Sequence, residues 1–332
     1  MSWDVVQHKG IHLPQIDWWL DATRPVPRSF VSHAHSDHIG RHEETLCTAA
    51  TARFMRLRQR ERGVKHLLPF GQTEQLTPDC TATLLPAGHI LGSAQILLEH
   101  SAHGRLLYTG DFKLRPGLAA EPCATPRADV LIMETTFGLP RYRMPPSDQV
   151  MADIVGFCRD ALAAGETPIL FGYSLGKSQE IIRGLLDAGL PVMAHAKTHE
   201  MCLAYAELGT PFDGIRLLDT ESPAGHVLLI PPQAGTAALF KKIPRRRTAV
   251  VTGWALDAGA RFRHRVDAAF PLSDHADYPD LLRFVEAVNP ARVHTVHGFA
   301  REFAADLRRR GREAWALGRD NQLEMPLADG GP

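Results

Sequence analysis

A short loop near the N-terminus carries an unusual density of metal-binding side chains. Three imidazoles and one carboxylate fall within six residues, directly after an apolar stretch: His33, His35, Asp37 and His38. Imidazole and carboxylate suit Zn²⁺ and its neighbours in the first transition row. A His-rich polar turn is the alternative, but a loop that leaves a strand can aim alternate side chains at one ion and adjacent ones at a second. The sequence therefore predicts a metal-dependent hydrolase with ligands for two ions.

Further ligand candidates recur in one local context, at the end of an apolar run and beside glycine. They are His89 in Gly88-His89-Ile90-Leu91-Gly92-Ser93, Asp111 in Thr109-Gly110-Asp111, and His297 in Val296-His297-Gly298. Glycine at such a strand end lets the backbone approach an ion or its bound substrate closely. Any one of these residues alone would be interpreted as an ordinary polar group. Together with the first loop, they supply about as many donors as a dinuclear site requires.

The length and the charge of the chain limit its class. Its 332 residues are enough for two lobes at about 150 residues per domain. The formal net charge is zero, so a nucleic-acid partner would be held by local basic patches and not by a global positive field. Arginine- and lysine-rich stretches lie at 56–62, 241–247, 261–265 and 308–312. Such runs are usually solvated faces, although some of them bind phosphate.

Cysteine usage and the first residues indicate an intracellular protein. The five cysteines are scattered, with no short spacing, and so predict neither a zinc ribbon nor a disulfide framework. Free thiols of this kind fit a reducing cytoplasm. The N-terminus lacks the basic and apolar regions of a signal peptide, and no apolar run reaches membrane-spanning length. We expect a cytoplasmic protein with no membrane partner.

The texture of the sequence changes at about residue 147. Residues 28–135 read as short strands separated by Gly, Pro and polar turns, with one helix at 49–61. From Ser147, which is expected to cap a helix that ends at Gly165, helices and strands alternate. This alternation is typical of a small α/β unit with a parallel sheet.

The position of the last ligand candidate predicts how the domains are connected. His297 must rejoin a site whose other ligands precede residue 112. The α/β unit at 148–252 is therefore expected to be an insertion. The metal-binding domain would then consist of residues 1–147 and 253–332.

The segment Gly172-Tyr173-Ser174-Leu175-Gly176-Lys177-Ser178 resembles a phosphate-binding loop but has the wrong spacing. A P-loop places four residues between its glycines before Lys-Ser, whereas three separate Gly172 from Gly176. Nucleoside triphosphate binding is therefore not expected. Backbone amides at a helix start would still suit a substrate phosphate. The side chains expected to contact such a phosphate are Ser93, Ser174, Lys177 and Ser178.

These motifs together resemble those of the metallo-β-lactamase superfamily. The resemblance rests on His-x-His-x-Asp-His at 33–38, on His89, on Asp111 in Thr-Gly-Asp, and on the late His297. Glu134 in Met-Glu-Thr-Thr-Phe-Gly, the inserted unit, and His275 in Ser-Asp-His-Ala-Asp are similar to the nucleic-acid-processing β-CASP branch. Within that branch the runs 253–257 and 270–278 look most like bacterial exonucleases associated with DNA ligase. The implied fold is α/β, an αββα sandwich with an inserted β-CASP cap.

The resemblance implies a role for each residue. His33, His35 and His89 would bind one metal, Asp37, His38 and His297 the other, and Asp111 would bridge them. The ions would be divalent transition metals, zinc in the first instance and manganese as an alternative. His275 would be the general acid, oriented by Glu134, with Asp37 as the further catalytic residue of the first loop. Asp21 is expected to support a ligand and not to bind metal itself.

The implied activity is that of a DNA exonuclease in repair, acting on single strands from the 5′ end, with a functional association with a DNA ligase. His297 complicates this expectation, because DNA-acting members of the crosslink-repair type usually lack a histidine at this motif and RNA-processing members have one. An RNA substrate, as in mRNA 3′-end processing, therefore stays open. A small-molecule hydrolase would have little use for a cap of roughly a hundred residues, and a non-catalytic scaffold would be expected to have lost ligands.

Overall fold

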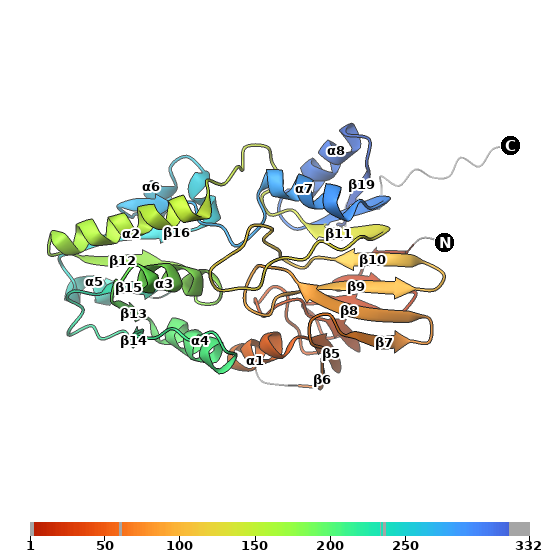
Figure 1. The fold of residues 1–332 in the computed structure, drawn as a ribbon, viewed down its shortest axis with the longest axis horizontal. Helices are drawn as coiled ribbons and strands as arrows, with labels where there is room; N and C mark the ends of the chain where they lie inside the picture. Colours follow the sequence, from red (N-terminus) through yellow and green to blue (C-terminus); the bar gives the residue numbers. More distant parts are fainter. Residues whose placement is uncertain (1–2, 60–61, 233, 235–236, 319–332) are drawn as a thin grey trace.

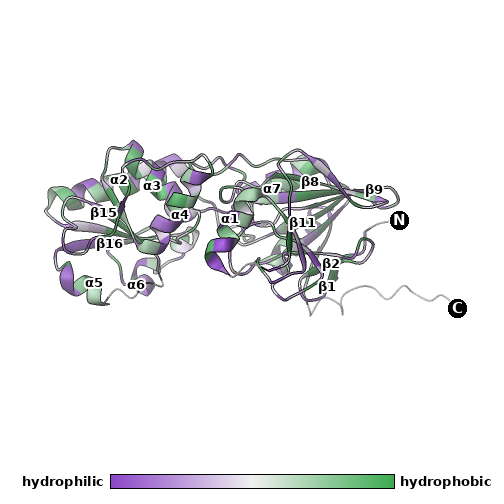
Figure 2. Cartoon of the chain, turned by 90° about the horizontal axis from the view of Figure 1, so that it is seen from below, coloured by the Kyte–Doolittle hydropathy of each residue, from purple (hydrophilic) through white to green (hydrophobic). Residues whose placement is uncertain are grey.

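The computed structural model describes residues 3–59, 62–232, 234 and 237–318. The chain forms two lobes that lie side by side, with hydrophobic residues concentrated along the strands inside each (Figures 1 and 2). The larger lobe holds two sheets. The first is formed, in order, by β1 (Val6–Gln7), β2 (Ile11–Leu13), β3 (Trp18–Leu20), β4 (Arg28–Phe30), β5 (Glu44–Cys47) and β6 (Val64–Leu67). The second is formed by β19 (Glu313–Ala316), β18 (Arg292–Val296), β11 (Val130–Glu134), β10 (Gly104–Tyr108), β9 (Ala94–His100), β8 (Cys80–Pro86) and β7 (Thr73–Thr77).

Alternating side chains make the larger lobe a four-layer sandwich. In β10, Leu106 joins the core between the two sheets, whereas the next residue, Leu107, joins a second core on the opposite face. This period of two is the pattern of a strand whose two faces are both covered. The second core is closed by α7 (Tyr278–Val288) and α8 (Ala300–Arg309), and α1 (Ala49–Arg58) packs beside the first sheet. The expected αββα arrangement is confirmed.

The smaller lobe, here called the cap, is built on a parallel sheet. Its strand order is β14 (Arg216–Leu217), β13 (Val192–Ala194), β15 (Val227–Ile230), β12 (Thr167–Phe171), β16 (Arg246–Val251) and β17 (Ala268–Phe270). Central strands such as β12 are buried throughout, as strands covered on both faces must be. One face packs against α2 (Ser147–Ala163), α3 (Lys177–Asp187) and α4 (Ala196–Glu207), and the other against α5 (Ala237–Lys242). The short helices η1 (Gly253–Leu256) and α6 (Ala260–His264) follow β16.

Two local expectations need correction. Ser147 does not cap α2, because the residue before the helix is Pro146 and no side chain accepts a bond there. The cap boundary expected at 252 leaves out β17, which pairs with β16 through Ala249 and Ala268. We propose that the cap continues to about residue 270, since a strand belongs with the sheet that satisfies its backbone hydrogen bonds.

Two buried ion pairs join the cap to the larger lobe. Lys113, which follows the Asp111 loop, lies 2.7 Å from Glu180 on α3. Lys177 at the start of α3 lies 2.8 Å from Asp274 of the larger lobe. All four residues are less than 10% exposed. Buried charges of this kind are tolerated only when each partner is present, because an unpaired ammonium or carboxylate in the interior is costly.

Glu180→Ala should therefore destabilise the protein by about 3 kcal/mol, because it leaves the Lys113 ammonium buried and unpaired. Chemical denaturation followed by fluorescence measures the change. The double variant Glu180→Leu/Lys113→Met removes both charges and should recover most of the loss. A single variant as stable as the wild type would show that water solvates Lys113 and that the pair is not structural.

Candidate metal centre

The ligand candidates come from loops at one edge of the two sheets. The His-rich loop follows β4, His89 lies in the turn between β8 and β9, and Asp111 follows β10. Because β10, β11 and β18 are parallel, residues after their carboxyl ends meet at the same edge. The approach is close: Gly110 has φ +55°, and a Cβ there would lie 2.4 Å from Cβ of Ser32. Only glycine fits between the two loops at this point.

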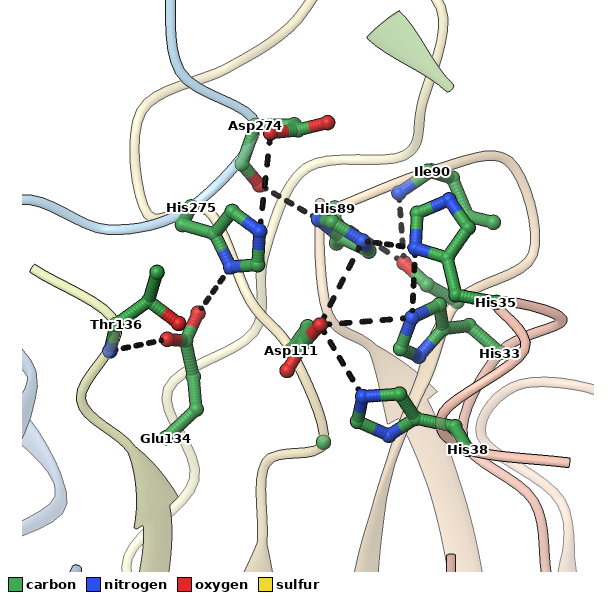
Figure 3. Close-up of polar contacts among 12 residues, drawn as sticks. His33, His35, His38, His89, Ile90, Asp111, Glu134, Thr136, Asp274 and His275 are labelled. Carbon is green, nitrogen blue, oxygen red and sulfur yellow. Dashed lines mark hydrogen bonds and ion pairs between the residues drawn. The ribbon is translucent and has the colours of Figure 1, made fainter. Parts of the chain in front are cut away.

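Three imidazoles converge on one point (Figure 3). His35 Nδ1 lies 3.0 Å from His33 Nε2 and 3.1 Å from His89 Nε2. Asp111 Oδ2 is 3.5 Å from His33 Nε2 and 3.9 Å from His89 Nε2. His33 and His89 are almost fully buried. This set of three nitrogens and one oxygen matches the donor types and number of a tetrahedral zinc site.

A second group of donors shares Asp111. His38 Nε2 lies 3.3 Å from Asp111 Oδ2, and ligand atoms of His38, Asp111 and His297 all lie within 4.8 Å of one another. His297 has φ +58°, a left-handed conformation that is uncommon for a residue other than glycine. Asp37 is placed differently: its side chain is 75% exposed and its Oδ2 is 3.8 Å from His38 Nε2. Among the described residues it belongs to neither group.

Each of four imidazoles is oriented by a hydrogen bond from its other nitrogen. His35 Nε2 donates to the Leu175 carbonyl at 3.1 Å, and His89 Nδ1 donates to the Asp274 carbonyl at 2.7 Å. His38 Nδ1 donates to Asp21 at 2.7 Å. The hydroxyl of Ser32 donates to Asp21 and so accepts from His33 Nδ1 at 3.0 Å.

These bonds place the ring protons outward and direct the remaining nitrogen of each ring inward. Lone pairs facing one another at 3.0 to 3.1 Å repel unless a cation lies among them. Outward donation to carbonyls and carboxylates is also the arrangement found around metal-bound histidines. The residues present therefore fit a bound metal ion.

Asp21 is an acceptor for several groups beneath the site. Its carboxylate accepts from Ser32 N at 2.7 Å, from the Ser32 hydroxyl at 2.6 Å and from the Tyr108 hydroxyl at 2.8 Å, in addition to His38. Three of these bonds go to Oδ2 and one to Oδ1, so most of the accepting capacity of the carboxylate is used within the protein. Asp21 thus orients His38, through the hydrogen bond that it accepts from Nδ1 of that ring.

The charges in the site follow from burial and from Asp111. Burial, together with the neighbouring imidazoles, lowers the pKa of His33 well below its usual range, and burial lowers the pKa of His89 to about 3. These rings are neutral, as metal ligands must be. Burial also acts on His38, but the carboxylates of Asp111 and Asp21 outweigh it and raise its pKa. Burial alone would raise the pKa of Asp111, whereas His38 and the other imidazoles hold it well below the usual value.

A carboxylate–imidazole pair stands beside the donors. His275 Nδ1 lies 2.8 Å from Oε1 of Glu134, which is fully buried at the end of β11. Backbone amides of Phe112 and Thr136 also donate to this carboxylate, at 3.2 and 2.9 Å. Burial by itself would lower the pKa of His275, but the neighbouring Glu134 carboxylate outweighs the effect of burial and raises the pKa to about 9. His275 lies in a loop before α7, which begins at Tyr278 and is capped by Asp277.

The residues expected to bind a substrate phosphate are mostly engaged elsewhere. Ser178 is buried and its hydroxyl donates to the Gly172 carbonyl. The hydroxyl of Ser93 accepts from the amides of His89 and Ile90, each at 3.1 Å, and closes their turn. Neither is available to a ligand, which corrects both expectations.

The two remaining phosphate candidates line the cavity. Lys177 is 2% exposed, and its ammonium donates to Asp274 Oδ1 and to the Leu272 carbonyl, each at 2.8 Å. The expectation that Lys177 contacts a phosphate is also corrected, because Asp274 already neutralises its ammonium. The amide of Gly176 donates to the side chain of Gln179 at 2.7 Å and is occupied. Ser174 is half-buried and reaches the cavity wall.

A cavity of about 770 Å³ joins the metal-binding groups to the cap. Its wall includes Asp111, His275 and His297 from the larger lobe and Tyr173, Ser174 and Leu175 from the cap. Sequence reasoning missed Leu175 and Asp274 as supports of the histidines. Each acts through a backbone carbonyl, which every residue has, so no sequence signal marks it. No helix in the part of the chain that the structure describes is long and apolar enough to cross a membrane.

Comparison with known proteins finds relatives among metal-dependent hydrolases and nucleases. Residues 262–317 match the family described as "Zn-dependent metallo-hydrolase RNA specificity domain". The chain is 59% identical over 332 residues to a "Probable DNA ligase" of Opitutus terrae, covering all of this chain and 33% of that protein. It is 28% identical over 291 residues to "5' exonuclease Apollo" of Gallus gallus, covering 84% of this chain and 60% of that protein.

Two further matches extend the comparison. An "RNase J-like protein" of Methanocaldococcus jannaschii is 28% identical over 193 residues, covering 51% of this chain and 44% of that protein. A solved structure, a protein of unknown function from Enterococcus faecalis V583, has a TM-score of 0.60 at 12% identity, covering 88% of this chain and 79% of that one. The chain thus spans between about a third and three fifths of the length of these curated relatives. These matches confirm the expected resemblance to the β-CASP branch of the metallo-β-lactamase superfamily.

Proposed function

We propose that this chain is a metal-dependent phosphodiesterase that acts as a DNA exonuclease in repair, on single strands and from the 5′ end. The observation that carries the proposal is the convergence of inward-facing imidazole nitrogens on Asp111, next to the His275–Glu134 pair and on the wall of one cavity. A phosphodiester placed there would meet both kinds of group. The names of the Opitutus and Gallus relatives support DNA as the substrate and a functional association with a DNA ligase.

The donors divide into two sets around Asp111. His33, His35 and His89 would hold one divalent ion, and His38 and His297 the second, with Asp111 between them. Asp37 remains the expected third ligand of the second ion, and its exposed carboxylate lies within reach of the cavity. Five imidazoles favour zinc, with manganese as the alternative. When bound, such ions supply a water of lowered pKa and neutralise charge on phosphate oxygens.

The chain's own residues handle the leaving group. Hydrolysis requires a proton on the 3′ oxygen that departs, because an alkoxide is a poor leaving group. Glu134 binds Nδ1 of His275, which leaves Nε2 as the atom that can carry a proton into the cavity. The carboxylate also fixes the ring and stabilises its protonated form. His275 is thus the proposed general acid and Glu134 its orienting partner.

RNA is the second candidate substrate, for a specific reason. The matching family description names RNA specificity, and the Methanocaldococcus relative is named RNase J-like. His297 is also present at the motif that RNA-processing members retain. A thioesterase or lactamase is less favoured, because residues of a second lobe form part of the wall of the 770 Å³ cavity.

The purified protein should contain close to two transition metals per chain, because the donors form two sets. His33→Ala and Asp111→Ala should lose metal and phosphodiester hydrolysis together, since each removes a donor from a buried group. Elemental analysis and hydrolysis of bis(4-nitrophenyl) phosphate measure the two quantities. His8→Ala, an exposed histidine far from the site in the sequence, serves as the control. Metal-free protein that remains active would refute the proposal.

His275→Ala should keep its metal but lose most cleavage of DNA, because the departing oxygen receives no proton. The loss should be much smaller on a phosphodiester with 4-nitrophenol as the leaving group, which departs without protonation. Comparing kcat on the two substrates measures the difference. Equal losses on both would make His275 structural, and loss of metal would make it a ligand.

Single-stranded DNA labelled at its 5′ end should release the label before the strand shortens from its other end. Parallel digests of single- and double-stranded DNA and RNA measure substrate and polarity together. Contacts of arginines with the phosphate backbone should make binding weaken steeply with salt. Degradation of RNA without any degradation of DNA would transfer the proposal to the second candidate substrate.

A further inference from the structure

Two exposed aromatic rings of the cap face the metal-binding cavity. Tyr173 is 54% exposed and Trp254 is 38% exposed, and both line the 770 Å³ cavity that contains Asp111 and His275. They also line a neighbouring cavity of about 420 Å³ on the cap. The two rings therefore lie at the boundary between the two cavities. Large aromatic groups left in water at such a place mark a binding surface more often than a packing defect.

The parallel sheet of the cap explains why these residues lie together. Tyr173 follows β12 and Trp254 follows β16, and these strands pair in register through Phe171 and Val250. Residues just beyond the carboxyl ends of neighbouring parallel strands share one edge of the sheet. This edge is where open α/β sheets bind their ligands. In this chain it is also the edge that faces the metal-binding groups.

Trp254 is held firmly although it is partly exposed. Its ring centroid lies 4.7 Å from that of Phe137 and 5.6 Å from that of Tyr142. The preceding Gly253 packs so closely that a Cβ there would lie 2.5 Å from the Phe137 ring. Trp254 is thus a preorganised surface, and little conformational entropy is lost when a flat group stacks on it.

Tyr173 is free by comparison. No side-chain hydrogen bond or ring contact connects it to another residue in the part of the chain that the structure describes. Its ring therefore contributes little to packing. Positively charged side chains line the same cavities, with Arg58 on the wall of the larger cavity and Arg263 on the wall of the smaller one.

We propose that Tyr173 and Trp254 form a stacking platform for the unpaired bases of a strand whose backbone lies at the metal centre. The inference rests on the proposed function and adds how the strand is held. Stacking on aromatic side chains tolerates any base, because every base has a π face. It favours single strands, because the faces of paired bases are already covered by their neighbours. Arg58 supplies positive charge for the phosphates between the stacked bases.

The test compares a strand with bases and a strand without them. Binding of a labelled ten-nucleotide oligothymidylate, and of the same length of abasic sugar phosphate, is measured by fluorescence anisotropy in a His275→Ala background that slows cleavage. Tyr173→Ala should weaken binding of the first strand by at least about five-fold, in line with the loss of one stacked base. Its effect on the abasic strand should be less than two-fold. Trp254→Ala should act in the same direction.

Conservative variants and a matched control separate stacking from misfolding. Tyr173→Phe and Trp254→Phe keep a flat ring and should retain most of the binding. Phe262→Ala removes an aromatic ring that is 76% exposed on α6 but lines neither cavity, and it should bind both strands like the parent. An equal loss on both strands, or a loss no larger than that of Phe262→Ala, would overturn the platform.

The outcome is independent of the proposed activity. Hydrolysis of bis(4-nitrophenyl) phosphate, which has no base, is measured on the wild-type protein in parallel. Hydrolysis together with binding that ignores bases would refute the platform alone. Base-dependent binding without hydrolysis would refute the proposed activity and leave the platform supported.

Discussion

The structure depends on keeping several buried imidazole nitrogens aimed at one another without a proton between them. Such an arrangement is unfavourable by itself, because lone pairs at 3.0 to 3.1 Å repel in this largely buried group. What maintains it is the outer ring of acceptors, which are a hydroxyl, a carboxylate and two carbonyls. Each fixes one tautomer, so the rings are selected for metal binding before any ion arrives.

The acceptors come from both lobes, and this gives the cap a role in the metal centre itself. The Leu175 carbonyl that accepts a hydrogen bond from His35 belongs to the cap. Lys177 of the cap also binds the side chain of Asp274, whose carbonyl accepts a hydrogen bond from His89. The segment 172–178, which resembles a P-loop but has the wrong spacing, thus helps to orient the histidines. The Lys177 ammonium and the start of α3 make contacts within the protein, which explains why Lys177 is not available to a phosphate.

The fold and the residues that gather at the site were largely predictable from the sequence, because both depend on strong local patterns. A His-x-His-x-Asp-His loop after a strand, and further donors at strand ends, leave few other arrangements of the chain. The supporting contacts were not predictable. Leu175 acts through its carbonyl, and Asp274 is distinguished only by its contact with Lys177, which lies 97 residues earlier in the chain.

Smaller errors have similar causes. Ser147 has the composition of a helix cap, but the tight start of α2 after Pro146 leaves its side chain without that bond. Strand β17 was not expected because it is only three residues long. The backbone pairing with β16 that assigns it to the cap cannot be recognised from the pattern of side chains.

The buried ion pairs across the two lobes have a mechanical consequence. Separating the lobes would pull Lys113 and Lys177 away from their carboxylate partners. It would also remove the Leu175 carbonyl that orients His35. These contacts oppose separation of the lobes, so we expect the width of the cavity between them to change little. Under the proposed function, a strand would have to slide along its own length through an opening of nearly constant width. The thickness and stiffness of the strand would then limit what enters, before any chemical group is recognised.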